Sequence, residues 1–182
     1  MRPRVCVSLT GRTPEEMLAL AREAVEGGAD MIELRLDFLE VISEREAVKA
    51  ARAVEGLEVP VIATLMGSSV GGRFPAGRDR ERVSILVELA PYVDYVDVGM
   101  DIEEGLRGRC VERVKENAGV IASYHDPEKT PGYKKILSIL NNELGEEADV
   151  CKAVFMARNL KDNLEALRAC LLFQGGRRVV FC

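Results

Sequence analysis

Met31-Ile32-Glu33-Leu34-Arg35-Leu36 is a short run rich in apolar residues, and an amphipathic stretch from Glu44 to Glu55 follows it. The same alternation recurs along the whole sequence, as is typical of repeated strand–helix units around a parallel sheet. Seven strands are predicted, at Val5 to Leu9, Met31 to Leu36, Val59 to Leu65, Tyr95 to Met100, Val120 to Tyr124, Val150 to Phe155 and Arg178 to Cys182. Six helices are predicted between them, at Pro14 to Glu26, Glu44 to Glu55, Asp79 to Ala90, Ile102 to Glu116, Gly132 to Leu144 and Leu160 to Leu172.

This array predicts an α/β fold of the (β/α)₈ TIM-barrel type, with about seven strands present and the last β/α unit missing. No linker or low-complexity stretch divides the sequence, so residues 1–182 are expected to form a single barrel domain. An open doubly wound sheet is the alternative, but no glycine-rich phosphate-binding turn follows the first strand. An unclosed barrel exposes strand edges and apolar side chains, so we expect a homo-oligomer, most simply a dimer that covers the opening.

Composition narrows the function classes. The sequence has 182 residues, 47% of them hydrophobic, and a net charge of -5 with acidic and basic residues interleaved, so nucleic acid is not expected as a partner. No apolar run approaches the roughly 20 residues that span a bilayer, and the start does not resemble a signal peptide, so we expect a cytoplasmic protein. The five cysteines are widely spaced and form no C-x-x-C pair, so neither a metal site nor disulfides are expected.

Polar residues gather where the predicted strands end. Strand alternation puts Glu33, Arg35 and Asp37 on one face of their strand, either as a salt-bridge ladder or as part of a site. His125 ends another strand, where it is either a structural residue or a base.

Lys152 lies inside the apolar strand Val150 to Phe155. An ammonium group buried there without a partner would have a lowered pKa, and a neutral lysine attacks ketones to form imines. The alternative is a lysine that reaches out to water. Lys152 with His125 on the preceding strand predicts proton abstraction next to a carbonyl.

These segments resemble type I 3-dehydroquinate dehydratases over nearly the whole chain. The opening strand and loop, the E-x-R-x-D strand, the histidine segment and the lysine segment occur in the family's order, as Val7-Ser8-Leu9-Thr10-Gly11-Arg12-Thr13, Ile32-Glu33-Leu34-Arg35-Leu36-Asp37, Ser123-Tyr124-His125-Asp126 and Ala148-Asp149-Val150-Cys151-Lys152-Ala153.

The resemblance implies that Lys152 forms a Schiff base with 3-dehydroquinate and that His125 removes the neighbouring proton and assists loss of water. The product would be 3-dehydroshikimate, an intermediate of the shikimate pathway of aromatic amino acid biosynthesis. Ser8, Glu33 and Arg35 would bind the polar groups of the substrate. The imine accepts the electron pair, so no cofactor is implied.

Three positions depart from the family pattern. Met66 stands in place of a substrate-binding arginine, Val70 in place of the acid that orients the histidine, and Gly99 in place of a glutamate. Two other interpretations therefore stay open. One is a non-catalytic barrel that binds a ligand or partner, and the other is a different Schiff-base lyase or aldolase.

Overall fold

The structure, a computed structural model, describes residues 4–182. Its seven strands are all parallel and pair in the order of the chain. They are β1 (Cys6–Leu9), β2 (Met31–Arg35), β3 (Val61–Thr64), β4 (Tyr95–Gly99), β5 (Gly119–Asp126), β6 (Val150–Phe155) and β7 (Arg177–Phe181). The predicted number of strands and the predicted parallel sheet are confirmed.

One helix follows each of the first six strands. These helices are α1 (Pro14–Glu26), α2 (Glu44–Ala53), α3 (Asp79–Leu89), α4 (Glu104–Val114), α5 (Tyr133–Gly145) and α6 (Leu160–Leu172). Helix α1 illustrates how the local sequence sets a boundary, because Thr13 accepts a hydrogen bond from the N–H of Glu16 and Pro14 begins the helix. None of the described helices is long and apolar enough to cross a membrane.

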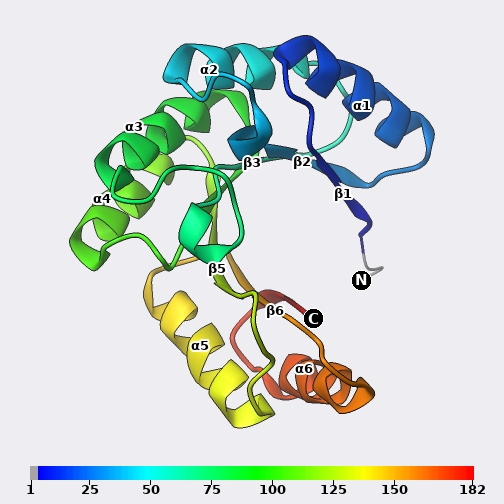
Figure 1. The fold of residues 1–182 in the computed structure, drawn as a ribbon, viewed down its shortest axis with the longest axis vertical. Coiled ribbons are helices and arrows are strands. Elements are labelled where there is room, and N and C mark those ends of the chain that lie inside the picture. Colours follow the sequence, from blue (N-terminus) through cyan, green and yellow to red (C-terminus); the bar gives the residue numbers. More distant parts are fainter. Residues whose placement is uncertain (1–3) are drawn as a thin grey trace.

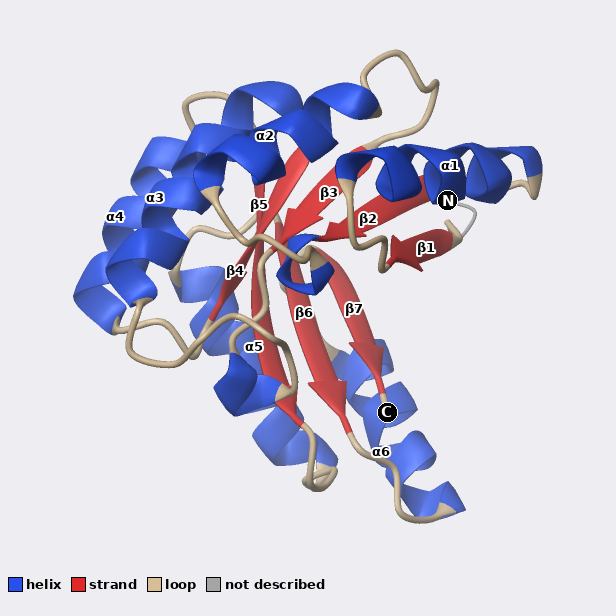
Figure 2. Ribbon diagram, turned by 45° about the horizontal axis from the view of Figure 1, so that its top comes forward, coloured by secondary structure: helices blue, strands red, loops and turns tan. Residues whose placement is uncertain are grey.

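The sheet curls but does not close (Figure 1). Strands β1 and β7 form its two edges, and the helices lie on the outer side of the curl (Figure 2). This arrangement confirms the predicted barrel-type α/β fold. It also leaves the concave face of the sheet accessible from the side where β1 and β7 would meet in a closed barrel.

The burial of β6 follows this geometry. Cys151, Ala153 and Phe155 are buried in a cluster with apolar residues of α5, whereas Val150, Lys152 and Val154 on the concave face are only half-buried. In a closed barrel, side chains from neighbouring strands fill the interior. Here the concave face keeps space beside its half-buried residues.

Aspartates occupy the amino ends of the strands. Asp30, Asp94 and Asp149 each precede a strand, and each accepts a hydrogen bond from a backbone N–H at the start of the preceding strand. The donors are Val5 at 2.9 Å, Val61 at 2.8 Å and Val120 at 2.8 Å. These carboxylates satisfy backbone groups that the ladder leaves unpaired, which is a stabilising role.

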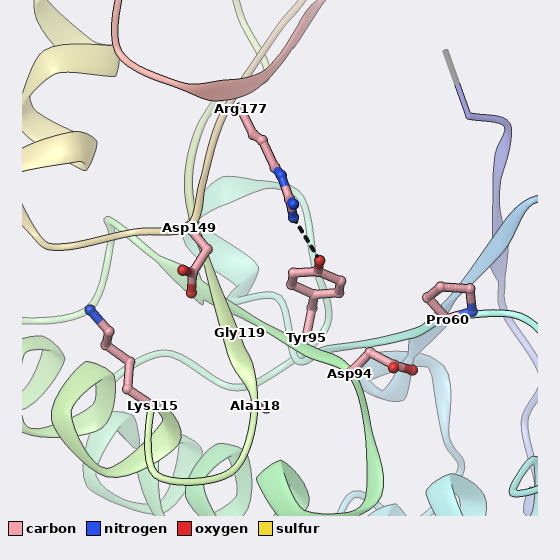
Figure 3. Close-up of a pocket in the computed structure, with 8 residues that line it drawn as sticks. All are labelled: Pro60, Asp94, Tyr95, Lys115, Ala118, Gly119, Asp149 and Arg177. Carbon is pink, nitrogen blue, oxygen red and sulfur yellow. Dashed lines mark hydrogen bonds between the residues drawn. The ribbon is translucent and has the colours of Figure 1, made fainter. Parts of the chain in front are cut away.

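A hollow of about 410 Å³ lies at the same end of the sheet. Figure 3 shows Arg177 reaching across it to the hydroxyl of Tyr95, with a hydrogen bond of 3.0 Å, and Asp94 and Asp149 beside it. In barrels of this type the chemistry occurs at the carboxyl ends of the strands, and the amino ends serve stability. The hollow at the amino ends is therefore not expected to be the site of the chemistry.

Candidate active site

Lys152 is the centre of a charged cluster on the concave face. Its Nζ atom lies 2.9 Å from Asp97 Oδ2 and 3.1 Å from Glu33 Oε1, and its side chain is 13% exposed. The three residues come from β6, β4 and β2, so they meet only because the sheet curls. Each charge in this cluster is paired, as burial requires.

Hydroxyl groups complete the cluster. Glu33 accepts hydrogen bonds from Ser8 on one oxygen and from Thr64, at 2.8 Å, on the other. Burial alone would raise the pKa of Glu33, but the Lys152 charge and these hydrogen bonds lower it to about 2. Glu33 is therefore ionised at neutral pH and holds the lysine in place.

Asp97 is a residue of this cluster that the sequence analysis did not predict, although its position inside an apolar strand could have indicated it. It lies between Val96 and Val98 in an apolar strand, just as Lys152 lies between Cys151 and Ala153. Asp97 is buried and accepts a hydrogen bond from the hydroxyl of Ser123. A second charged residue of opposite sign inside an apolar strand indicates an ion-pair partner for the first.

The predicted lowered pKa of Lys152 is wrong in sign. Burial alone would lower it, but the charges of Asp97 and Glu33 and their hydrogen bonds raise it above the ordinary value. The prediction assumed a lysine without a partner, and the structure provides two. Lys152 is therefore an ammonium ion before substrate arrives, so one of its protons must leave before the nitrogen can attack a ketone.

Lys152, Glu33 and Ser8 line a cavity of about 590 Å³ on the concave face of the sheet. Apolar side chains such as Ile62, Ile121 and Val179 form much of the remaining wall. Tyr95 and Arg177 line it as well, so the cavity extends from Lys152 toward the amino ends of the strands, and His125 and Arg35 are not among its lining residues. A cavity of this size accommodates a small organic molecule, and a few polar groups within an apolar lining can orient it.

His125 lies on β5, two residues beyond Ser123, so both side chains point to the concave face. Its Nε2 atom is buried and has no hydrogen-bond partner among residues 4–182. Burial lowers the pKa of His125, and the nearby Lys152 charge acts in the same direction, whereas Asp97, Glu33 and Asp101 oppose them. The imidazole is therefore largely neutral at pH 7, which is the form that accepts a proton.

The expected face of Glu33, Arg35 and Asp37 needs a correction. Strand β2 ends at Arg35, and Leu36–Phe38 forms a 3₁₀ turn that contains Asp37. Asp37 binds the Arg35 guanidinium through two hydrogen bonds, of 2.9 and 2.8 Å. Asp37 therefore anchors Arg35 instead of extending the row of strand side chains. Within residues 4–182, Arg35 makes no hydrogen bond or ion pair with Lys152, Glu33 or Asp97.

Arg73 lies close to Arg35. The guanidinium carbon of Arg73 lies 3.9 Å from the centre of the Phe38 ring, and that of Arg35 lies 4.9 Å from it. The backbone N–H of Arg73 also donates a hydrogen bond to Asp37. Cation–π contact fixes both side chains beside the carboxyl end of β2. This end of the sheet therefore carries two guanidinium groups, and that of Arg35 is already paired with Asp37.

A family model described as type I 3-dehydroquinase matches residues 5–177. The chain belongs to this family. A 3-dehydroquinate dehydratase of Methanopyrus kandleri is 39% identical over 163 residues, which cover 90% of this chain and 72% of the relative. The corresponding protein of Methanococcoides burtonii is 33% identical and covers 93% of this chain and 72% of the relative. The suspected resemblance is confirmed.

Solved structures of 3-dehydroquinate dehydratases agree with the fold. One from Clostridium difficile, which contains covalently modified comenic acid, has a TM-score of 0.89 and 26% identity and covers 98% of this chain and 74% of the other. One from Aquifex aeolicus has a TM-score of 0.83 and 25% identity, with 98% and 80% covered. A deoxyribose-phosphate aldolase of Coccidioides immitis resembles only the fold, with a TM-score of 0.61 and 16% identity over 97% of this chain and 69% of the other.

Proposed function

We propose that this chain dehydrates 3-dehydroquinate to 3-dehydroshikimate through a Schiff base on Lys152. The observation that carries the proposal is the placement of the Lys152 ammonium, with two carboxylates, in a cavity at the concave face of the sheet. Membership of the family and the dehydratase names of the relatives support it. The covalently modified ligand in the Clostridium difficile structure supports covalent chemistry in this family. The reaction would serve the shikimate pathway in the cytoplasm.

The first step needs a neutral amine. One proton passes from Lys152 to Asp97 or Glu33, which lie within 3.1 Å of its nitrogen. The nitrogen then attacks the ketone carbon, and loss of the former ketone oxygen as water leaves an imine, which is protonated on nitrogen. The adjacent carboxylates stabilise this cation as they stabilise the ammonium group.

His125 carries the proton in the second step. It removes a proton from the carbon next to the imine, and the electron pair moves toward the imine nitrogen to form an enamine. The enamine then expels the hydroxyl group on the following carbon, and His125 returns its proton so that water leaves. Hydrolysis of the conjugated imine releases the product and restores Lys152.

Ser8, Glu33 and Arg35 bind the substrate in this scheme. Ser8 and Glu33 line the cavity, and the Ser8 hydroxyl donates a hydrogen bond to the Glu33 carboxylate. Hydroxyl groups of the substrate can replace this hydrogen bond. Arg35, which Asp37 holds, and the exposed Arg73 lie beside the carboxyl end of β2, and the proposal assigns the substrate carboxylate to this end of the sheet.

Borohydride trapping tests the proposal directly. Protein incubated with 3-dehydroquinate and borohydride should gain a reduced adduct in the intact mass spectrum, because reduction makes the imine permanent. Lys152→Arg keeps the positive charge between Glu33 and Asp97 but forms no stable imine, so it should give no adduct. The absence of an adduct on the wild-type protein would favour the non-catalytic interpretation.

We also propose that the protein forms a dimer of identical chains. Helix α6 carries Leu160, Leu164, Leu167 and Leu171 with exposed fractions of 78, 58, 59 and 79%. Their spacing of four, three and four residues places them in one stripe, opposite the buried Ala166 and Ala169 that face the sheet. A stripe of leucines is self-complementary, so a second copy of the same helix can bury it.

The charges beside the stripe favour a parallel pair of α6 helices. Lys161 and Arg168 lie on one flank and the uncharged Asn163 and Cys170 on the other. A parallel pair brings the basic flank against the uncharged one, whereas an antiparallel pair brings two basic flanks together.

Light scattering on two double variants locates the dimer interface. Replacing Leu164 and Leu167 with glutamine should give a monomer, since burying each leucine contributes about 1.5–3 kcal/mol. The matched pair Val179→Gln and Phe181→Gln changes the apolar open edge, where the side chains are 42% and 50% exposed. If only the Val179→Gln and Phe181→Gln double variant dissociates the dimer, the interface covers the open edge of the sheet, as the sequence predicted. The proposal of an interface through α6 would then be wrong.

A further inference from the structure

An ion pair that none of the proposed catalytic steps uses lies at the carboxyl ends of β3 and β4. Arg82, from α3, donates to the backbone oxygen of Leu65 at 2.6 Å and to Asp101 Oδ2 at 2.7 Å. The Arg82 side chain is only 3% exposed, and that of Asp101 is 14% exposed. A buried guanidinium group with two fixed acceptors holds the Asp101 carboxylate rigidly.

The carboxylate of Asp101 fills the place where a side chain at position 99 would lie. A Cβ atom added to Gly99 would collide with Oδ1 of Asp101 and would lie 2.8 Å from Arg82 Nη2. The backbone makes this possible, because the chain turns directly after β4 and the N–H of Ile102 donates to the oxygen of Gly99. Gly99 therefore admits a carboxylate that reaches back from Asp101.

The alternation of strands places this carboxylate beside His125. Asp97 and Gly99 point to the same face of β4, and Ser123 and His125 point to the same face of β5. The side chains of Asp97 and Ser123 are in hydrogen-bond contact. Gly99 lies two residues after Asp97, and His125 lies two residues after Ser123, so a side chain at position 99 would be a neighbour of His125. The carboxylate of Asp101 occupies that place.

We propose that Asp101 is the carboxylate partner that positions His125, and that Arg82 fixes Asp101 for this role. The proposal rests on the proposed function of His125 as the base. In this proposal Asp101, which lies in the turn after β4, does what the family's acid does at the position that Val70 occupies here. Asp101 acts through His125 and is a positioning residue, because it need not touch the substrate.

The charges around His125 agree with this arrangement. Besides Asp101, the charges of Asp97 on β4, Glu33 on β2 and Lys152 on β6 act on the imidazole. Burial and the Lys152 charge lower the pKa of His125, and the three carboxylates raise it. The lowering effects are the larger, so the net pKa lies below the ordinary value. Arg82 is bound to Asp101 and limits how far that carboxylate raises the pKa.

The chain contains a single histidine, so its imidazole proton resonances can be assigned without ambiguity. In Asp101→Asn, the pKa of His125 measured by NMR titration should fall by on the order of one unit, because a neighbouring carboxylate is lost. In the dehydratase assay, kcat should fall with little change in KM, and the acidic limb of the pH–rate profile should move by the same amount. Glu104→Gln removes one exposed acid from the first turn of α4 and should change neither quantity.

Gly99→Ala provides a second route to the same answer. The added methyl group must displace the Asp101 carboxylate, so the titration of His125 should shift although Asp101 is still present. If both folded variants titrate as the wild type does, Asp101 is not the partner of His125. A shifted titration in a protein that never forms an adduct with 3-dehydroquinate would instead refute the proposed function and leave the contact standing.

Discussion

Lys152→Met is expected to lower kcat for dehydration of 3-dehydroquinate by on the order of 10³-fold or more. The substitution removes the amine that forms the imine in the proposed mechanism, and loss of a covalent nucleophile commonly has effects of this size. Formation of the conjugated product can be followed by ultraviolet absorbance under steady-state conditions. Activity within tenfold of the wild type would show that the reaction does not pass through this lysine.

The same substitution should destabilise the fold, because Glu33 and Asp97 would share one buried region without a counter-charge. Removing one partner of a buried ion pair costs about 3–5 kcal/mol. The lowered pKa of Glu33 sets the pH dependence: this stabilisation is present above the ordinary value of 4.5 and is lost as pH falls toward about 2.

Denaturant unfolding measures this difference in stability between the two proteins at each pH. The difference should be greatest near neutral pH and should shrink as pH falls through this window. Lys152→Arg is the control, since it retains the charge. It should lose activity as Lys152→Met does but keep more of the stability, which separates the chemical role of the lysine from its structural role.

Glu143→Met is expected to stabilise the protein, and the gain should increase with pH. Glu143 lies on α5 with a fully buried side chain, and within residues 4–182 neither carboxylate oxygen makes a hydrogen bond of good geometry, although the nearby backbone N–H groups of Tyr124 and Lys152 act to lower its pKa. Burial, with a smaller effect from the charge of Asp97, raises the pKa of Glu143 to about 9. The folded protein therefore holds a proton at neutral pH that the unfolded chain has released.

The raised pKa fixes the sign of this dependence. Stability is fully present below the ordinary pKa of 4.5 and is lost as pH rises toward about 9. Each pH unit in this window lowers the free energy of unfolding by up to about 1.4 kcal/mol. The loss of stability at pH 8 therefore reaches several kcal/mol. Methionine has a similar volume and no charge, and it removes the penalty.

Denaturant unfolding at several values between pH 5 and 9 would measure this gain. Glu112→Met, at an exposed position of α4, is the matched control and should show no growing advantage. A constant difference between wild type and Glu143→Met across the range would mean that Glu143 is ionised in the folded protein.

The sequence by itself determined the strands, their order and the identity of the central lysine. Alternating runs such as Met31 to Leu36 and Glu44 to Glu55 are local features, and the periods of strands and helices can be read from them directly. Thr13 and Pro14 marked a helix start in the same way. The motif around Lys152 pointed to imine chemistry because a charge inside an apolar strand needs a reason.

Only the tertiary structure decided how these residues act on one another. The curl of the sheet brings Glu33 and Asp97 to Lys152 from strands far apart in the sequence, and this reverses the expected direction of the lysine pKa. Asp101 reaches the position of Gly99 only because a turn follows β4 and Arg82 arrives from α3. A strand pattern determines which face a side chain takes, but electrostatic effects depend on distances in space, and the folded sheet alone sets those distances.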